Sequence, residues 1–210
     1  MTRATVVDTS VSDSKAAGSA LGVRILEDMP GERPDAVILF ASPRYAFPPL
    51  LQALDAACQP RNLVGSSSAG EFTTSVQGEG MACAMALRAP EMEFRAAVGR
   101  NLSGDREGAA RQIVSSFAGL NRHDFAYRSV LVMADALAGQ TEQLVEHLNV
   151  LLGGLYRFVG GGAGGGLDAV RAELGEAQFA GCNSIGQIAR AEGQLSGFHN
   201  CTAVVCVIPE

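Results

Sequence analysis

One order of elements occurs twice along this chain of 210 residues. In the first copy, the apolar run 36–42 (AVILFAS) predicts a buried strand. Residues 47–58 (FPPLLQALDAAC) have helical spacing of their apolar positions, with proline in the first turn, where a helix tolerates it. Residues 62–65 predict a second short strand, which runs into a turn of small residues at 65–70 (GSSSAG). The first copy is therefore a strand, a helix, a strand and a small-residue turn.

The second copy has the same pattern built from different residues. Residues 129–134 (SVLVMA) predict a strand, and residues 140–152 predict a helix with its leucines on one face. Residues 156–160 (YRFVG) predict a second strand that enters the glycine run 160–166 (GGGAGGG). Both copies therefore end in a turn without bulky side chains.

Aligning the copies places Val64-Gly65 on Val159-Gly160. Two copies indicate one duplicated β-α-β unit, because a solenoid needs three or more repeats. Parallel strands in one sheet need right-handed crossovers, which the intervening helices supply. The sequence thus predicts an α/β fold. Its mixed sheet core is built from two related β-α-β units, about 34–100 and 128–208, in one sheet or in two facing sheets, with helices packed on the sheet faces.

The rest of the chain adds weaker elements. Residues 1–20 predict an N-terminal lead, either irregular or an edge strand with a short helix from Asp13 to Leu21, ahead of a single domain at 21–210. Strands at 80–89 and 92–100 predict a hairpin around Pro90-Glu91. The remaining predictions are a helix over 104–118 with Ser103 as its N-cap, a short helix at 167–175, and strands at 177–185 and 200–208.

Composition excludes several classes of partner. The chain is 47% hydrophobic and 18% charged, as expected of a globular protein, and its net charge is −6. Lys15 is the only lysine, so nucleic acid and anionic lipid are poor partners. The N-terminus lacks the apolar segment of a secretory signal, and no apolar stretch approaches the ~20 residues of a membrane span. The sequence therefore predicts a cytoplasmic protein with no membrane partner.

The cysteines fit a reducing compartment. They show no C-x-x-C spacing and lie mostly in apolar runs, so the prediction is that they are buried as small hydrophobic residues. They are Cys58, Cys83, Cys182, Cys201 and Cys206.

The serine turn raises the hypothesis of a hydrolase. A nucleophile elbow has the sequence G-x-S-x-G, in which Gly65 and Ser67 fit, but Ala69 occupies the closing position. Ser67, Asp135 and His199 follow the chain order of that hydrolase class. Order alone is weak support, because scattered Ser, Asp and His residues provide it in most sequences. Small side chains needed for close packing explain the turn better.

The glycine run and the histidines carry less information. Residues 160–165 satisfy G-x-G-x-x-G, but a run of this composition matches almost any glycine motif, and no acidic residue follows at the expected distance. Its bare backbone N–H groups could still cradle an anion. His199 and Cys201 are the only pair at short ligand spacing, and two ligands do not close a zinc site. No metal site is therefore predicted.

Arg44 and Glu71 are two charged residues that follow the predicted strands of the first copy. Arg44 and Tyr45 follow the first strand, and Glu71 follows the serine turn. In parallel sheets, ligands bind at the carboxyl ends of strands. Arg44 could therefore bind a ligand carboxylate, or it could pair with Glu71.

The segments PDAVILFASPRY and VGSSSAGEF resemble the N-terminal FIST domain. The resemblance extends from near Pro34 to about Val207, and it is strongest at 34–74. It implies a bacterial sensory module that binds a small ligand, with amino acids as proposed ligands and haem-based nitric oxide sensing linked to some members. It also implies a C-terminal companion domain, which we do not expect within these 210 residues. Ser66 stands where the family commonly has cysteine, and Gly165 and Gly166 replace acidic residues that often follow the second turn.

The sequence therefore predicts a non-catalytic signal-transduction domain that binds a small polar ligand, such as an amino acid, without a cofactor. The expected partners besides the ligand are a companion domain or a signalling protein, or a second copy in a homo-oligomer. Three alternatives stay open: a serine hydrolase, a haem sensor with His147 or His199 as ligand, and a half-module whose sheet edge pairs with another chain. The predicted ligand-binding residues are Pro43, Arg44, Tyr45, Ser66, Ser67, Ser68, Gly70, Glu71, Gly161, Gly162 and Gly164.

Overall fold

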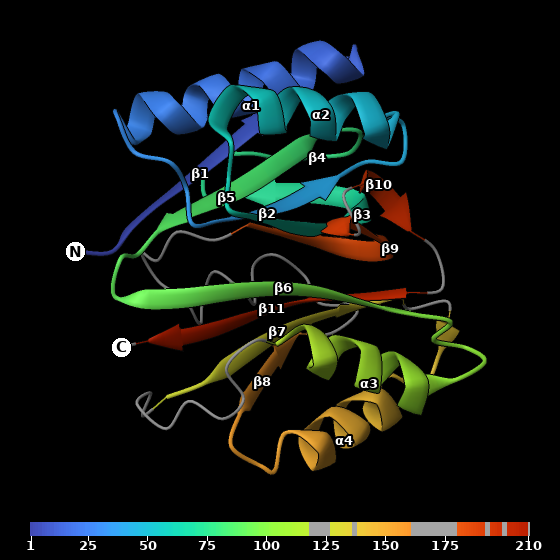
Figure 1. The fold of residues 1–210 in the computed structure, drawn as a ribbon. Coiled ribbons are helices and arrows are strands. Elements are labelled where there is room, and N and C mark those ends of the chain that lie inside the picture. The colour runs from blue at the N-terminus through green and yellow to red at the C-terminus, as the bar shows by residue number, and fades with distance from the viewer. Residues whose placement is uncertain (118–126, 136–137, 161–179, 192–193, 199–200, 210) are drawn as a thin grey trace.

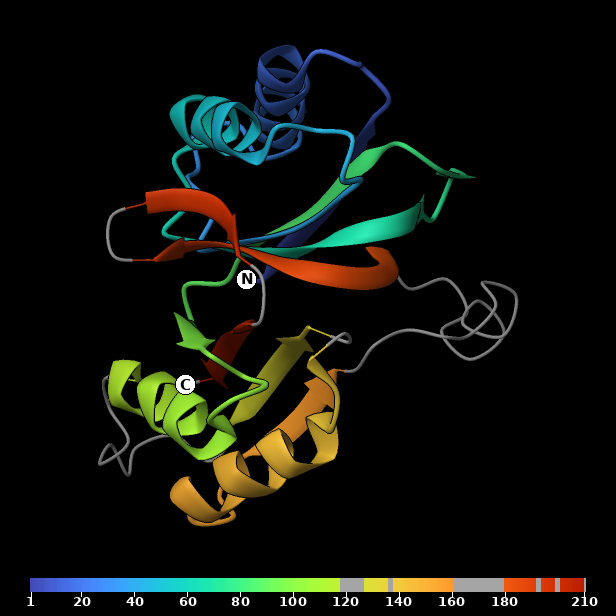
Figure 2. The ribbon, with the colours of Figure 1, turned by 90° about the vertical axis from the view of Figure 1, so that its right-hand side faces the viewer.

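Two β-sheets face each other between two layers of helices in the computed structural model of the chain (Figures 1 and 2). The structure describes residues 1–117, 127–135, 138–160, 180–191, 194–198 and 201–209. Helices α1 (Ser14–Asp28) and α2 (Phe47–Cys58) cover the outer face of the first sheet. Helices α3 (Arg106–Ser116) and α4 (Thr141–Leu151) cover the outer face of the second. The chain is thus an α/β protein whose two sheets lie between two helical layers.

Both sheets have the same strand order, so the duplication is a property of the fold. The first sheet has the order β1-β5-β2-β3, continued by β9 and β10, with β4 beside β3. The second has the order β6-β11-β7-β8. The strands of the two sheets are β1 (Arg3–Thr9), β2 (Ala36–Ala41), β3 (Asn62–Thr73), β4 (Gln77–Gly78), β5 (Ala82–Arg88), β6 (Met92–Arg100), β7 (Ser129–Ala134), β8 (Arg157–Gly160), β9 (Ala180–Ala191), β10 (Gln194–Phe198) and β11 (Cys201–Pro209).

Strand directions agree as well as strand order. The pairs β2/β3 and β7/β8 are parallel, as the two predicted β-α-β units require. The pairs β1/β5 and β6/β11 are antiparallel in both sheets. The structural equivalence therefore begins at β1 in the first half of the chain and at β6 in the second. Of the two arrangements predicted, the units lie in two facing sheets.

The two aligned glycines hold equivalent positions in these parallel pairs. Gly65 lies opposite Leu39, and Gly160 lies opposite Val132. A Cβ atom on Gly65 would lie 1.7 Å from the Leu39 carbonyl oxygen, and one on Gly160 would lie 2.0 Å from the Val132 carbonyl oxygen. Gly160 also has a φ of +142°, which residues other than glycine rarely adopt. Both copies therefore need glycine because the neighbouring strand occupies the space of a side chain.

Strand alternation divides the core into three apolar layers. On β2, Val37 and Leu39 face α1 and α2, whereas Ile38 faces the second sheet. Ile38, Val64 and Met133 form the buried part of the seam cluster, which joins the two sheets. A separate cluster packs α3 and α4 on the outer face of the second sheet. The seam cluster is thus what holds the two units face to face.

The predicted hairpin between residues 80 and 100 is wrong. Its two strands exist, but β5 lies between β1 and β2 in the first sheet, and β6 pairs with β11 in the second. The short link around Pro90 therefore passes from one sheet to the other. Local sequence could not reveal this, because the partner of β6 is more than a hundred residues away.

Helix ends and C-terminal strands also differ from prediction. The first helix extends to Asp28, past the predicted end at Leu21, and the N-cap of α3 is Asp105, not Ser103. Asp105 accepts a hydrogen bond from the Gly108 amide at 2.8 Å. The strands predicted at 177–185 and 200–208 correspond to β9 and β11, and β10 was not predicted. The helix predicted at 167–175 lies outside the described residues.

We expect Gly65→Ala to lower the free energy of unfolding by about 3 kcal/mol or more, because the new methyl group would displace backbone in a packed sheet. Gly70→Ala on the same strand is the matched control. Its Cβ would lie 3.9 Å from the nearest atom, the Gly78 carbonyl oxygen, so we expect a change within about 0.5 kcal/mol. Urea denaturation of both variants measures the difference, and equal stabilities would contradict the close approach.

Candidate functional site

The serine segment is the interior of a strand, which corrects the predicted turn. Strand β3 continues through it to Thr73, with β2 on one side and β9 on the other. Ser67, for example, lies opposite Ala41 of β2 and Gly186 of β9. Small polar residues resemble a turn in sequence, but here strands on both sides satisfy the backbone. Ser66, Ser67 and Ser68 are all buried.

The serines do not converge on one point. Val64 belongs to the seam cluster, and Leu63 belongs to the core under α1 and α2. Alternation along the strand therefore places Ser66 on the seam side and Ser67 on the helix side. A nucleophile elbow needs its serine exposed on a sharp strand-to-helix turn, which Ser67 does not have.

A bulge in β3 brings Ser68 and Glu71 together. The register with β9 shifts between Ser67 and Ser68, and again between Ser68 and Glu71. Bulges redirect side chains and often lie near binding sites. The Ser68 hydroxyl donates a hydrogen bond to Glu71 Oε1, and the Met81 amide donates to Glu71 Oε2 at 2.8 Å. The Glu71 carboxylate thus accepts hydrogen bonds from a hydroxyl and an amide. The residue is only 1% exposed.

Arg44 does not pair with Glu71, which settles one alternative left open by the sequence. Its Nη2 atom donates to the Ser10 carbonyl oxygen at 2.8 Å and to the Tyr45 hydroxyl at 2.9 Å. The guanidinium also stacks on the Tyr45 ring, 4.8 Å from its centroid. Tyr45 itself is a core residue, whereas Pro43 and Arg44 are exposed.

Arg44 and Glu71 nevertheless flank the same short turn at residues 80–81. Arg44 Nη1 lies 3.3 Å from the position of a Cβ on Gly80, which has a φ of +72°. The Met81 amide binds Glu71, and the Met81 carbonyl accepts from the Ser42 amide at 2.9 Å. The turn therefore has a guanidinium on one side and a buried carboxylate on the other. Sequence reasoning did not select Gly80 or Met81, and only the G-E-G pattern at 78–80 marks the turn.

The other predicted site residues are less informative. Gly70 is partly buried on β3, while Gly161, Gly162, Gly164 and His199 lie outside the described residues. His147 is half-buried on α4, as predicted. Among the residues that the structure describes, no three His, Cys, Asp or Glu side chains are placed to hold a metal ion. No helix in the described ranges is long and apolar enough to cross a membrane.

Asp35 is a second buried carboxylate, and arginine side chains neutralise its charge. Asp35 is 4% exposed and contacts Arg88 Nη1 at 2.6 Å, Arg61 Nη1 at 3.3 Å and the Ala89 amide at 2.8 Å. These contacts tie the start of β2 to the end of β5 and the start of β3. A cavity of about 370 Å³ adjoins them, lined by Asp35, Arg61, Asn62 and residues 92–95. Asp35 therefore forms structural ion pairs with two guanidinium groups.

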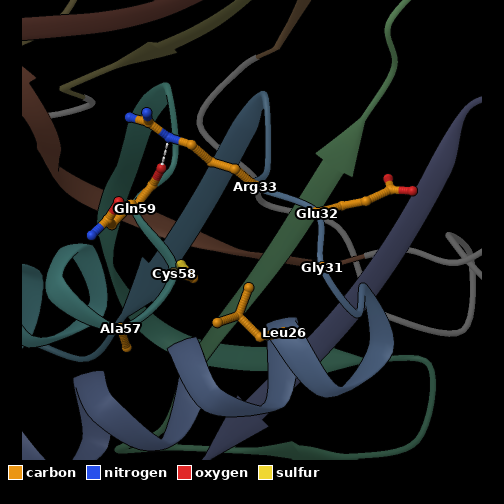
Figure 3. Close-up of a pocket in the computed structure, with 7 residues that line it drawn as sticks. All are labelled: Leu26, Gly31, Glu32, Arg33, Ala57, Cys58 and Gln59. Carbon is orange, nitrogen blue, oxygen red and sulfur yellow. Dashed lines mark hydrogen bonds between the residues drawn. The ribbon is translucent and has the colours of Figure 1, made fainter.

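A third feature is a cavity of about 300 Å³ between the ends of α1 and α2, shown in Figure 3. The Arg33 Nε–H donates to the Gln59 carbonyl oxygen across its mouth. Burial raises the pKa of the Cys58 thiol to about 11, and the thiol donates to the Leu54 carbonyl oxygen at 3.4 Å. Cys58 and Cys83 are both buried, as predicted. The thiol in this cavity is therefore kept in its unreactive, protonated form.

Comparisons with known proteins give one family. The model of the FIST N domain matches residues 35–169, which include β2, β3 and the Ser66–Glu71 segment. No curated protein matches the chain. Among solved structures, a cyanuric acid hydrolase from A. caulinodans is similar at 12% identity and a TM-score of 0.35, over 100% of this chain and 68% of that chain.

We expect Ser68 and Glu71 to be energetically coupled. Ser68→Ala removes a donor from a buried carboxylate, so it should cost about 1.5–3 kcal/mol of stability. In Glu71→Gln the charge is absent, and the same serine substitution should then cost about 1 kcal/mol or less. A double-mutant cycle in urea measures the difference, and additive effects would show that the contact contributes nothing.

We expect Cys58 to react slowly with iodoacetamide at pH 8, because little of its thiol is ionised there. Alkylation should accelerate as the pH rises towards 11. The unfolded thiol ionises near 9.0, before the folded one, so the stability contributed by Cys58 should fall between pH 9.0 and 11. Peptide mapping by mass spectrometry follows Cys58 alone, and a rate equal to that of a cysteine peptide would contradict the burial.

Proposed function

The chain belongs to the FIST N domain family, a family of sensory and signal-transduction domains, and on this premise we propose that it binds a small zwitterionic ligand without catalysing a reaction. The observation that carries the proposal is the Glu71 carboxylate. Among the residues whose side chains the structure describes, no Lys or Arg lies within ion-pair distance of it, although it is almost fully buried.

Burial makes the charge of the Glu71 carboxylate costly. An ion removed from water loses several kcal/mol of solvation, and hydrogen bonds from neutral groups offset only part of that cost. Asp35 offsets its cost with two arginines, whereas Glu71 has a hydroxyl and an amide. A ligand ammonium group would supply the missing positive charge. Glu71 is therefore suited to recognise an amine.

Arg44 suits the other end of such a ligand. It is exposed, and its Nη1 atom lies against Gly80, one residue from the amide that binds Glu71. Because its Nη2 atom donates to Ser10 and Tyr45, Arg44 would bind a ligand carboxylate through Nη1, by a charge-assisted hydrogen bond. An amino acid bound at the 80–81 turn would place its carboxylate towards Arg44 and its ammonium towards Glu71. The amino group would compete with the Met81 amide for Glu71, so binding would shift the turn and provide a signal.

The test is a thermal-shift and calorimetric screen of amino acids, with their decarboxylated amines and N-acetylated forms alongside. Ligand that binds the native state stabilises it by about 2.7 kcal/mol at a hundred times Kd. We expect amino acids to raise Tm and both altered series to bind at least ten times more weakly. Glu71→Gln should abolish the shift, and Arg44→Gln should weaken it.

Arg33→Gln is the matched control, because Arg33 is also near the surface but lines the cavity between α1 and α2. It should leave the binding of amino acids unchanged. Circular dichroism confirms that each variant is folded. If no zwitterion shifts Tm, or if Glu71→Gln binds as well as the wild type, the proposal is wrong.

A further inference from the structure

The two equivalent sheets differ at one edge. In the first sheet, the outer edge of β3 is paired antiparallel with β9. In the second sheet, the equivalent strand β8 pairs with β7 alone among the described residues. The aligned valines also differ in exposure: Val64 of β3 is 0% exposed, whereas Val159 of β8 is 63% exposed. Within the part of the chain that the structure describes, strand β8 therefore has an open edge where its counterpart is covered.

Exposed apolar side chains lie near the amino end of β8. Tyr127 is 67% exposed and Leu155 is 64% exposed, and Val150 and Leu151 are exposed at the end of α4. Backbone hydrogen bonds hold these segments together: the Gly154 amide donates to the Asn149 carbonyl at 3.0 Å, and the Arg157 amide donates to the Arg128 carbonyl at 2.8 Å. Exposed apolar edges invite strand pairing, and exposed apolar patches mark interaction surfaces.

We propose that β8 pairs antiparallel with β8 of a second copy of this chain, which joins the two four-stranded sheets into one. The first sheet shows that this kind of edge accepts an antiparallel strand. A two-fold axis perpendicular to the sheet gives that direction, and it keeps the same face of both sheets on the same side. The α4 helices of the two copies then lie on one side of the joined sheet, which brings their exposed apolar ends to the interface.

The sequence of β8 fits one register of this pairing. Residues directly opposite each other must point to the same face of the sheet. The two-fold axis therefore lies midway between the two copies of one residue, and that residue pairs with itself. With Val159 on the axis, its exposed side chain meets the same valine of the second copy, and Phe158 lies opposite Gly160. The two Arg157 residues are then offset by four positions, about 13 Å along the strands, beyond the screening length of about 8 Å. The register buries the apolar residue and separates the like charges.

Light scattering and cross-linking test the pairing. The wild-type chain should elute at twice its mass of 21.8 kDa. Val159→Lys places two ammonium groups at the axis, so we expect it to elute as a folded monomer whose Tm does not depend on protein concentration. Val159→Cys should form a disulfide-linked dimer under mild oxidation. Val23→Lys and Val23→Cys are the matched controls, because Val23 on α1 is 51% exposed but lies in the first unit. Val23→Lys should stay dimeric. Val23→Cys should form no disulfide between chains.

Three outcomes would overturn the proposal. They are a monomeric wild type over the accessible concentration range, a Val159→Lys variant that remains dimeric, and a dimeric Val159→Cys variant that forms no disulfide. Cross-linking of Val159→Cys does not depend on the behaviour of the lysine variant, so misfolding of that variant would leave the test intact. Amino-acid binding at Glu71 should be the same in the monomeric variant, which keeps this test separate from that of ligand binding.

Discussion

The close approach of two parallel strands, repeated in both halves of the chain, is the constraint on which the rest of the structure depends. The carbonyl oxygens of Leu39 and Val132 occupy the space that a side chain would need at Gly65 and Gly160. Register follows from this contact, since a shift of one residue would put a side chain against the carbonyl. Register in turn decides which residues face the seam between the sheets, because neighbouring side chains on a strand point to opposite faces. Val64 is placed in the seam cluster by this alternation, and Ser66 faces the same side.

Two of the buried carboxylates, Asp35 and Glu71, show how one fold treats charge in two ways. Asp35 has two guanidinium partners and a backbone amide, and it ties three strands together at one end of the first sheet. Glu71 has a hydroxyl and an amide, and it holds a turn that contains a glycine with positive φ. An ion pair with full partners resists change, because removing either partner leaves a buried charge. A carboxylate that accepts hydrogen bonds from neutral groups, as Glu71 does from Ser68 and Met81, can exchange one of them for a cation.

Local pattern predicted the elements that are locally determined. The apolar runs of β2 and β7 and the leucine spacing of α2 gave the right element types, with bounds close to those observed. The duplication and the aligned glycines were also predictable, because they are visible in the order of residues. The path through Ser66–Ser68 was not, since its strand character comes from β9, a partner more than a hundred residues away. The same reason explains β6, whose partner is β11 rather than the adjacent β5. Of the site, Arg44 and Glu71 were identified by their place after strands, but their separate partners required the geometry of the 80–81 turn.

The differences between the two copies are more informative about function than their shared scaffold. Both keep the glycine that the strand contact requires, but the residues after it diverge from SSSAGE at 66–71 to GGAGGG at 161–166. Gly166 therefore aligns with Glu71, so the carboxylate belongs to the first copy alone. Charge also diverges at the start of the parallel strands, where the position of Asp35 is taken in the second copy by Arg128, which stacks on Tyr156 at 5.5 Å. A backbone demand common to both copies explains why the scaffold repeats. A carboxylate present in one copy means that the polar site occurs once per chain, so a symmetric pair of chains would carry two such sites, one in each first unit.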